Sequence, residues 1–428
     1  MASRRRVAIT GIGVVSPYGV GRELFWREIC RGASAVRPIT EFDASPFPCR
    51  VAAAVPPIEE AEVTEAEEAA RSERPARGGE TGSGARRRAK ASIIGVLAAR
   101  EAWADAGLDG ADREAAVVIG SGAGGIDVAE RQYREFFAGA PARVSPWAIP
   151  VSIVGIVSSE ISIALGLHGP SHVVSTGCTS STDAIGYAAA LVRAGEADVV
   201  LSGGVDACVT PGMIFGFSRM RAVSTRYNDA PAEASRPFDR GRDGFVLGEG
   251  AWIVVLEDEA RARARGARPY ATVEGYGSTC DAYHRVQMDP DGEQIVRAMR
   301  LAVERAGRAL EEIGYVNYHG TSTVLNDAVE SRCVRRLFGR LADRVPGSST
   351  KSMIGHPQGA SGAAGVVTAA LALARGFLPP TINQVDPDPA CDLDYLPNAG
   401  RPACPAAALC NCLGFGSKNS ALVLGAVP

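Results

Sequence analysis

The chain has 428 residues, 46% of them hydrophobic and 22% charged, which is the composition of a globular protein long enough for two domains. Its formal net charge of −3 argues against a nucleic-acid binder that depends on an overall basic surface. It contains no run of about 18 charge-free apolar residues, so we expect no membrane-spanning segment.

Six segments in the first half of the chain alternate between expected strand and expected helix. The strand segments are short and apolar, with glycine close behind them, and the helix segments are longer and rich in small residues. The strands are expected over Val7–Val15, Ala115–Ile119, Val173–Thr176 and Ala197–Ser202, and the helices over Ala91–Ala106 and Ser181–Ala194. This alternation predicts α/β layers with mostly parallel strands.

The segment from Glu59 to Lys90 interrupts this pattern. It is acidic and alanine-rich at first, and then becomes rich in glycine and arginine. Such a composition predicts a mobile excursion from the core.

Two pairs of similar segments indicate an internal repeat. The first pair holds an opening strand and turn, the second pair holds a closing strand, and both pairs occur in the same order along the chain. The pairs are Ile9–Gly13 with Val273–Gly277, and Gly248–Leu256 with Gly416–Leu424. They predict two related halves. The N-terminal half, 1–265, carries the insertions, and the C-terminal half is 266–428.

The ten cysteines are scattered without paired CxxC spacing. In a long chain this favours reduced thiols in a cytoplasmic protein, and it argues against a disulfide framework or a zinc site. No spacing supplies a set of metal ligands, so we expect neither a metal nor an organic cofactor. The basic start of the chain is interpreted as part of a first strand, not as a targeting signal.

Three residues are candidates for chemistry: Cys178, His319 and His356. Both histidines lie in glycine-dense loops after apolar segments, where α/β proteins place catalytic groups. Cys178 follows a strand and Gly177 and precedes a helix, so unpaired N–H groups at the helix start would favour a thiolate and bind an oxyanion. The alternatives are an inert buried thiol and histidines that only satisfy loop carbonyls.

A cysteine with two histidines suggests acyl transfer through a thioester. Thiolate attack on a thioester is nearly isoenergetic, and two imidazoles can donate hydrogen bonds to a carbonyl that develops enolate charge. A hydrolase would more often pair one histidine with an Asp or Asn.

Several long motifs occur in order along nearly the whole chain, besides the two histidine loops. They are Ile9-Thr-Gly-Ile-Gly-Val-Val-Ser-Pro17, Ser175-Thr-Gly-Cys-Thr-Ser-Ser181, Val200-Leu-Ser-Gly-Gly-Val-Asp206, the segment from Ser235 to Gly250, and Leu413-Gly-Phe-Gly-Ser-Lys-Asn419. On these motifs the sequence resembles the elongating β-ketoacyl synthases, or 3-oxoacyl-[acyl-carrier-protein] synthases, of the thiolase superfamily. The resemblance implies a five-layer αβαβα fold built from two similar halves.

The resemblance also implies the reaction. Cys178 would be the acylated nucleophile, with the backbone N–H groups of Cys178 and Phe415 as its oxyanion hole. His319 and His356 would bind the malonyl thioester carbonyl and promote decarboxylation to an enolate, which attacks the Cys178 thioester. Phe415 would also act as a gating aromatic.

Lys351 and Glu330 match a support pair of the family. A lysine near an imidazole should disfavour the imidazolium, so Lys351 would keep His356 neutral as an N–H donor. Glu330 would hold Lys351 in place. The alternative is a purely structural ion pair.

By resemblance the partners are acyl carrier protein and a second chain, in a homodimer or in a heterodimer with a chain-length factor; nucleic acid and membrane are not expected. Because the carrier is acidic, a basic docking patch is expected. The candidates are Arg86, Arg87, Arg88, Lys90 and Arg226.

The chain also departs from the usual family pattern at several positions. Tyr318 and Trp252 replace small residues. Ser417-Lys418 stands where Gly-Thr is typical, and Pro357-Gln358 after His356 is unusual for the fatty-acid enzymes. Gly177 before the nucleophile is more typical of polyketide synthases. These changes favour a bacterial polyketide or polyene pathway, with fatty-acid elongation as the alternative.

Three further hypotheses stay open. A non-catalytic subunit resembling a chain-length factor would not need Cys178 and both histidines. A thiolase-like enzyme would need a second cysteine as base, and Cys410 and Cys412 lie near the C-terminus without the expected glycine context. A cysteine-dependent amidase is the third.

Overall fold

The structure is a computed structural model that describes residues 5–58, 88–108, 110 and 112–427. Most of the excursion expected at 59–90 therefore lies outside the described residues, as do the docking candidates Arg86 and Arg87.

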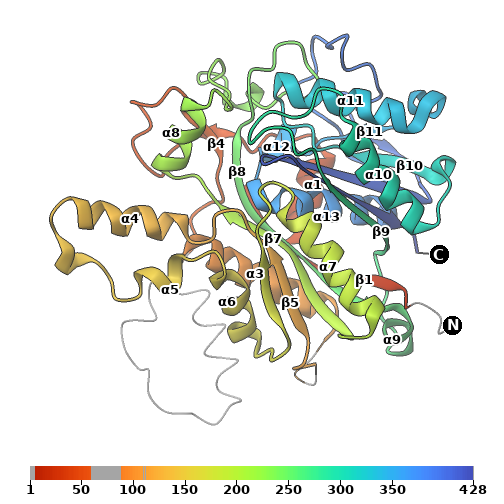
Figure 1. Cartoon of the computed structure of the whole chain (residues 1–428), viewed down its shortest axis with the longest axis horizontal. Coiled ribbons are helices and arrows are strands. Elements are labelled where there is room, and N and C mark those ends of the chain that lie inside the picture. The colour runs from red at the N-terminus through yellow and green to blue at the C-terminus, as the bar shows by residue number, and fades with distance from the viewer. Residues whose placement is uncertain (1–4, 59–87, 109, 111, 428) are drawn as a thin grey trace.

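Strands and helices alternate along the described chain (Figure 1). The strands are β1 (Val7–Ser16), β2 (Gly19–Val20), β3 (Arg37–Pro38), β4 (Val51–Ala53), β5 (Ala116–Gly120), β6 (Ser171–Val174), β7 (Val199–Ala207), β8 (Leu247–Asp258), β9 (Ala271–Cys280), β10 (Ile313–Asn317), β11 (Gly347–Ser348), β12 (Phe377–Leu378), β13 (Arg401–Pro402), β14 (Ala407–Gly414) and β15 (Lys418–Gly425). The helices are α1 (Arg22–Cys30), α3 (Lys90–Asp105), α4 (Ile126–Phe137), α5 (Ala148–Ser152), α6 (Ile156–Leu165), α7 (Ser180–Ala194), α8 (Pro211–Arg219), α9 (Glu259–Ala264), α10 (Glu293–Ala306), α11 (Val324–Phe338), α12 (Lys351–Ile354) and α13 (Ser361–Arg375).

The six predicted segments form the expected kinds of element, with ends shifted by a few residues. The largest difference is in β7, which runs on to Ala207 instead of ending at Ser202. The prediction was accurate here because each segment has a local signal of apolar strand, glycine turn or small-residue helix.

Within the described residues, ten strands follow one another in the order β11-β10-β14-β15-β9-β1-β8-β7-β5-β6. This order contains the same unit twice. In one unit β1 and β8 are antiparallel, β8 and β7 are antiparallel, and β7, β5 and β6 run parallel. In the other unit β9, β15, β14, β10 and β11 repeat these pairings in the same sequence order. The predicted internal repeat is therefore confirmed by the topology. The expectation of mostly parallel strands is wrong, because β8 and β15 lie antiparallel between their neighbours and β1 is antiparallel to β9.

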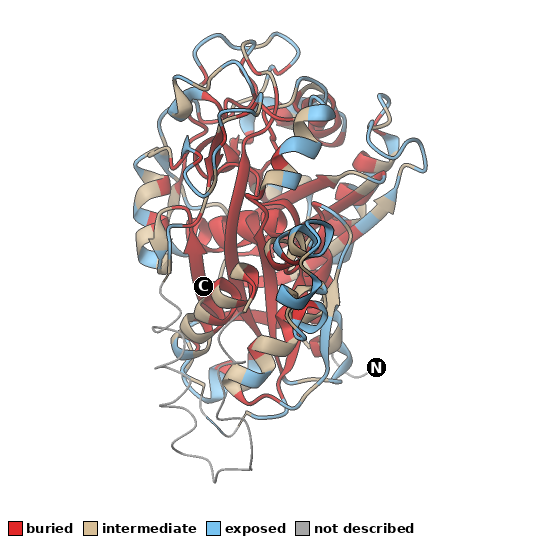
Figure 2. Ribbon diagram, turned by 90° about the vertical axis from the view of Figure 1, so that its left-hand side faces the viewer, coloured by how far each residue is buried: buried red, intermediate tan, exposed pale blue. Residues whose placement is uncertain are grey.

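The helices complete a five-layer arrangement. The middle layer is α7 and α13, which pack on each other and contact strands of both units. Helices α3 and α6 cover the outer face of the first unit, and α10, with α11 packed against it, covers the second. This is the expected αβαβα order, and the buried residues concentrate in the strands and the middle helices (Figure 2).

Glycines on equivalent strands let the outer helices approach closely. A β-carbon added at Gly13 of β1 would lie 1.9 Å from the Ala98 carbonyl oxygen of α3. The equivalent Gly277 of β9 would place a β-carbon 2.1 Å from the Ala298 carbonyl oxygen of α10. The similar segments noticed in the sequence thus share a packing requirement in both halves, because any side chain there would force strand and helix apart.

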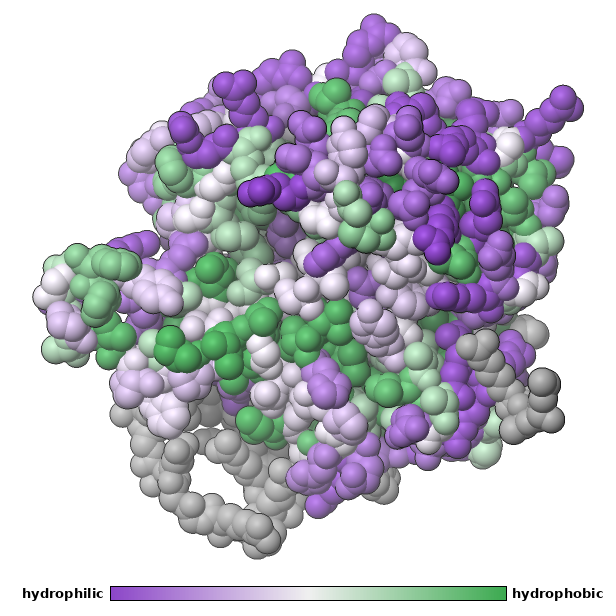
Figure 3. Space-filling view, in the orientation of Figure 1, coloured by the Kyte–Doolittle hydropathy of each residue, from purple (hydrophilic) through white to green (hydrophobic). Residues whose placement is uncertain are grey.

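One face of the molecule carries exposed apolar side chains over α4, α5 and α6 (Figure 3). They are Tyr133, Phe136, Phe137, Ile149, Ile153 and Ile163. The neighbouring strand β6 ends the sheet and, among the described residues, pairs only with β5. None of the helices in the described part of the chain is long and apolar enough to cross a bilayer.

Replacing Gly13 with Ala should destabilise the protein by about 3 kcal/mol, the upper part of the usual range for overpacking, because the new methyl group meets the α3 backbone. Gly216→Ala is the matched control, since a β-carbon at Gly216 meets nothing within 4 Å. Urea unfolding should give a clearly lower midpoint for Gly13→Ala only. Equal midpoints for the two variants would contradict the close packing of β1 and α3.

Candidate active site

Cys178 lies in the connection between β6 and α7, as predicted. Gly177 has a φ of +71°, in the left-handed region that favours glycine, and α7 begins at Ser180, two residues after the cysteine. The Cys178 side chain is 6% exposed. The turn therefore presents a buried sulfur at the start of a long helix in the middle layer.

Asp183, in the first turn of α7, holds this connection in shape. Its carboxylate accepts hydrogen bonds from the hydroxyls of Thr176 (2.6 Å) and Thr179 (3.0 Å), which flank Cys178. It also accepts from the hydroxyls of Tyr276 on β9 and Ser420 on β15. The turn is thereby tied to strands of the second half. Our sequence analysis did not single out Asp183, because only the fold brings these four hydroxyls together.

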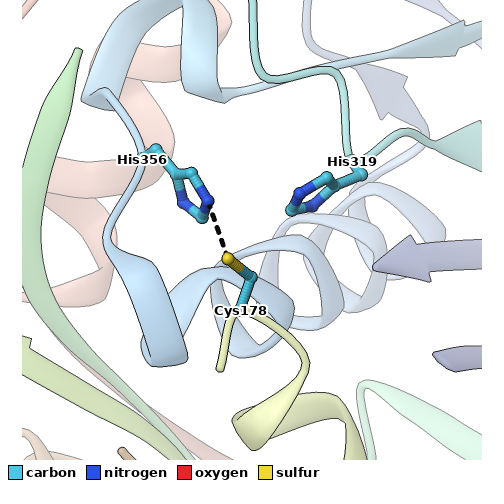
Figure 4. Close-up of side chains that lie close together, drawn as sticks. All are labelled: Cys178, His319 and His356. Atoms are coloured by element: carbon cyan, nitrogen blue, oxygen red, sulfur yellow. Dashed lines mark hydrogen bonds between the residues drawn. The ribbon is translucent and has the colours of Figure 1, made fainter. Parts of the chain in front are cut away.

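His319 and His356 lie opposite Cys178 on loops of the second half (Figure 4). The Nε2 atom of His356 is 3.2 Å from the Cys178 sulfur. The two imidazole rings are 5.3 Å apart between centroids and nearly perpendicular. The sulfur and one nitrogen of each ring all lie within 4.8 Å of one another, so the fold brings the three predicted residues into one site. The other three histidines of the chain are exposed.

Glu330 supports the His319 loop and does not contact Lys351. Its carboxylate accepts from the backbone N–H groups of His319 (2.7 Å) and Gly320 (2.8 Å), and from the Asn411 amide (2.7 Å). No ion pair among the described residues joins Glu330 to Lys351, so the alternative of a structural ion pair between them is not supported. The physical reason is that nearer N–H donors occupy the carboxylate, whose charge acts on Lys351 only at longer range.

Burial sets the protonation of the site. It raises the pKa of the Cys178 thiol to about 11, although the backbone N–H of Phe415 and the charge of Lys351 oppose this rise. Burial also lowers the pKa of His356 and of His319 well below the usual value, and the charge of Lys351 adds to both shifts. The expectation that Lys351 favours a neutral His356 is confirmed in direction. The expectation of a thiolate is wrong for this site, because desolvation outweighs the helix N-terminus.

A cavity of about 300 Å³ opens beside the Cys178 sulfur. Phe415 and Gly414 line one side of it, and the backbone N–H groups of Phe415 and Cys178 both interact with the sulfur. The wall toward solvent is largely apolar and includes Met220, Val286, Met288, Val324 and Leu325. The arrangement suits an acyl group held on sulfur, with N–H donors for an oxyanion beside it.

Two family descriptions match most of the chain. "Beta-ketoacyl synthase, N-terminal domain" matches residues 4–262, and "Beta-ketoacyl synthase, C-terminal domain" matches residues 270–385. The chain belongs to the β-ketoacyl synthase family. The family named from the motifs is therefore confirmed.

Relatives and solved structures match this β-ketoacyl synthase over its full length. It is 40% identical to "3-oxoacyl-[acyl-carrier-protein] synthase 2" of Coxiella burnetii, over 99% of both chains. The protein of the same name from Synechocystis is 40% identical, over 98% of this chain and 97% of the other. The structure described as "The ishigamide ketosynthase/chain length factor" has a TM-score of 0.88 and 35% identity, covering 100% of both chains.

A second solved structure holds "type II PKS acyl-carrier protein in complex with its ketosynthase bound to the hexaketide". It has a TM-score of 0.88 and 31% identity, covering 99% of this chain and 100% of the other. The predicted thiolase-like fold is thus confirmed by neighbours that align over the whole β-ketoacyl synthase.

Asp206, at the end of β7, is a further buried acid that we did not single out for a role. Its carboxylate accepts from the backbone N–H groups of Gly122 (2.9 Å), Ala123 (3.1 Å) and Gly359 (2.6 Å). These bonds join the glycine-rich turn after β5 to the loop that follows His356. The signal for such a role was the glycine-rich turn itself, since glycine-rich turns leave N–H groups free to bind an anion.

The unusual residues Tyr318 and Trp252 point into the core and not into the cavity. Tyr318 is 1% exposed and packs edge-on against the rings of Phe238 and Tyr395. Trp252 is fully buried against Phe25. Neither of the two large aromatic residues lines the cavity beside Cys178. The departures at these two positions therefore change core packing in this β-ketoacyl synthase.

The Cys178, His319 and His356 cluster is also close enough together to surround a metal ion. Spacing in the sequence gave no sign of such a set, because the three residues come from separate loops of the two halves. Two neutral imidazoles would be suitable ligands, whereas the Cys178 thiol would first have to lose its proton and the nearby charge of Lys351 would oppose a cation.

All three docking candidates that the structure describes form ion pairs within the chain, and two of them lie at or just before the start of α3. Arg88 pairs with Glu160 at 2.8 Å, and both side chains are only 13% exposed. Lys90 pairs with Glu249 at 2.5 Å, and Glu249 is 1% exposed. These contacts give Arg88 and Lys90 a structural role in anchoring the start of α3.

Arg226 is placed differently, at the surface near the cavity. Its side chain is 61% exposed and lies 3.6 Å from the carboxylate of Asp243, which lines the cavity. Among the described candidates it is the one best placed to meet an acidic partner.

The reaction of Cys178 with iodoacetamide should become about tenfold faster for each pH unit between about pH 6 and about pH 9, because only the thiolate reacts. With a pKa of about 11, the thiolate fraction still rises throughout that range. The rate is measured by mass spectrometry of the peptide that carries Cys178.

Protein unfolded in urea provides the control, since its thiols titrate near about 8.5. A rate in the folded protein that levels off below about pH 8 would show a stabilised thiolate and would contradict the effect of burial described here.

Proposed function

We propose that this chain catalyses the decarboxylative Claisen condensation of a β-ketoacyl synthase, joining an acyl chain held on Cys178 to a malonyl group on acyl carrier protein. The observation that carries the proposal is the cavity in which the Cys178 sulfur and a nitrogen of both His319 and His356 lie within 4.8 Å of one another. The relatives named above, which are 3-oxoacyl-[acyl-carrier-protein] synthases, support the same reaction.

In the first half-reaction Cys178 takes the acyl group. The thiol proton passes to His356 Nε2, which lies 3.2 Å from the sulfur, and the sulfur attacks the acyl thioester. The oxyanion that forms accepts hydrogen bonds from the backbone N–H groups of Cys178 and Phe415. The bond to the carrier's sulfur breaks, and that sulfur leaves as a thiol with the proton from His356.

In the second half-reaction the malonyl thioester carbonyl accepts hydrogen bonds from the N–H groups of His319 and His356. The bond to the carboxylate carbon breaks, carbon dioxide leaves, and the electron pair forms an enolate that the two donors stabilise. The enolate carbon attacks the Cys178 thioester carbonyl. The carbon–sulfur bond breaks, and the Cys178 sulfur leaves as a thiolate that takes up one proton from solvent water, giving a 3-oxoacyl product on the carrier.

Neutral imidazoles suit both half-reactions. Among the described residues His356 Nδ1 has no hydrogen-bond partner, so neither tautomer of this ring is fixed. His356 can therefore accept a proton at Nε2 in the first half-reaction and donate from Nε2 in the second. Lys351 would act by keeping the imidazolium unfavourable, and Glu330 by holding the His319 loop.

The proposed partners are acyl carrier protein and a second chain. An acidic carrier would approach the cavity mouth beside Arg226. The second chain would cover the exposed apolar residues of α4, α5 and α6 and pair with the free edge of β6 (Figure 3). The neighbour described as a ketosynthase/chain length factor supports a heterodimer, and a homodimer is the alternative.

We also propose a polyketide or polyene pathway in a bacterial type II system, supported by the structural neighbour described as a type II PKS ketosynthase with its acyl carrier protein. Elongation of fatty acids is the second candidate, favoured by the 40% identity to the synthases named above. A cytoplasmic location would suit the ten free cysteines. The division into halves at 1–265 and 266–428 would place Cys178 in one and both histidines in the other.

Cys178→Ala should abolish transfer of an acyl group from acyl carrier protein to the protein, because Cys178 is the one thiol among the described residues that lines the cavity. Intact-mass measurement detects the added acyl group. Cys208→Ala is the matched control, since Cys208 is equally buried and does not line the cavity, and it should be acylated like the wild type.

His319→Ala should still be acylated but release carbon dioxide from malonyl carrier protein about a hundredfold more slowly or worse, as expected when a general acid or hydrogen-bond donor is lost. Acylation of the Cys178→Ala variant would refute the assignment of Cys178 as the nucleophile. Unchanged carbon dioxide release by His319→Ala would refute the role of the imidazoles.

A further inference from the structure

Ser417 departs from the family pattern and lies near the site, although it does not line the cavity. It belongs to the turn that joins β14 to β15, two residues after Phe415, and it is 7% exposed. Its φ of +63° is in the left-handed region, which favours glycine and disfavours a residue with a β-carbon. A serine is expected here only where its side chain makes contacts that offset this strain.

The Ser417 hydroxyl binds the backbone of the segment 281–288, which forms part of the cavity wall. It donates to the carbonyl oxygen of His284 at 2.9 Å and accepts from the N–H groups of Tyr283 and His284, both at 3.2 Å. A hydroxyl has one proton and two lone pairs, so these three bonds use its whole capacity. A glycine at this position would leave all three backbone groups without this partner.

His284 shapes the segment that Ser417 binds. Its Nδ1 atom accepts from the backbone N–H groups of Val286 at 3.1 Å and Gln287 at 3.0 Å. Val286 and Gln287 both line the cavity. Ser417 is therefore bonded to the residue around which this part of the cavity wall is folded.

Two backbone hydrogen bonds run beside those of the hydroxyl. The N–H of Gly416 donates to the Arg285 carbonyl at 2.9 Å, and the N–H of Asp281 donates to the Ser417 carbonyl at 2.8 Å. Phe415 begins the turn that is held in this way, and its backbone N–H interacts with the Cys178 sulfur. The place of that N–H thus depends on how firmly the turn 415–417 is held.

We propose that Ser417 is a positioning residue, whose hydroxyl holds the turn 415–417 against the segment 281–288 and so fixes the Phe415 N–H beside the Cys178 sulfur. The inference rests on the proposed function, and it concerns a serine where the family pattern has glycine. The oxyanion that this N–H binds forms when an acyl group reaches Cys178, whereas decarboxylation of the malonyl group depends on the two imidazoles. Loss of the hydroxyl should therefore affect acylation more than decarboxylation.

Ser417→Gly tests the proposal, because it removes the hydroxyl and keeps a residue that suits the left-handed backbone. Asn398→Gly is the matched control. Asn398 has a φ of +59°, and its side chain also joins two backbone groups, the N–H and the carbonyl of Gln384, at 3.2 and 2.7 Å. Neither Asn398 nor Gln384 lines the cavity.

We expect Ser417→Gly to slow acylation of Cys178 at saturating acyl carrier protein by about fivefold, a fraction of the hundredfold loss that follows removal of a whole oxyanion donor. The carrier concentration that gives half the maximal rate should stay within about twofold, because the hydroxyl does not line the cavity. Carbon dioxide release from malonyl carrier protein without an acyl donor should also change less than about twofold. Asn398→Gly should match the wild type in all three measurements.

Hydrogen exchange followed by mass spectrometry measures how firmly the turn is held. In Ser417→Gly the peptides that contain 281–288 and 415–417 should exchange about tenfold faster than in the wild type, because the amides of Tyr283 and His284 lose their acceptor. The same peptides should be unchanged in Asn398→Gly.

Acylation of Ser417→Gly at the rate of Asn398→Gly overturns the inference, and so does unchanged hydrogen exchange in both segments. An equal loss of acylation and carbon dioxide release also overturns it, because that would mean a general distortion of the site. If acyl carrier protein does not acylate the wild type at all, the proposed function fails, while hydrogen exchange still decides whether Ser417 holds the turn.

Discussion

Burial of a thiol and two imidazoles beside a lysine determines how this site works. Desolvation favours the neutral form of each group, so it raises the pKa of Cys178 and lowers those of His319 and His356. The charge of Lys351 adds to the effect on both histidines. The result is a site whose thiol and imidazoles are neutral before the reaction, with N–H donors placed beside the oxyanion or enolate that forms on the substrate. That distribution favours the transition state over the resting complex.

The repeated fold is what creates this burial. Each half supplies one five-stranded unit of the sheet, and helices α7 and α13 contact strands of both units. Cys178 stands at the start of α7, and the histidines come from loops of the other half, so the two units must be packed together before the site exists. Asp183 couples them directly, since its carboxylate binds hydroxyls on both sides of Cys178 and on two strands of the second half. Errors in packing between the halves would therefore appear first as errors in the catalytic geometry.

The sequence predicted what local patterns determine. The turn around Cys178 could be predicted because its strand, glycine, cysteine and small-residue helix are neighbours in the chain. The repeat could be predicted from the two glycine-containing strands. Contacts between residues that are distant in the chain could not be predicted from the sequence. The thiolate was wrongly expected because the helix start is visible in the sequence while the second half that buries Cys178 is not. Glu330 was assigned to Lys351 because motifs give residue types, whereas nearer backbone N–H groups decide which partner a carboxylate binds. Ser417 was noted only as a departure from the family pattern, since its bonds to the segment 281–288 exist only in the folded chain.

The most direct test of this account is the protonation of the two buried imidazoles. Nitrogen-15 NMR of histidine-labelled protein, followed from about pH 5 to about pH 8, reports the charge of each ring, with assignments from His319→Ala and His356→Ala. The same rings in urea should titrate near about 6.5. We expect both to remain neutral over the whole range in the folded protein. A titration of either ring near its ordinary value, or an imidazolium paired with a Cys178 thiolate, would contradict the account.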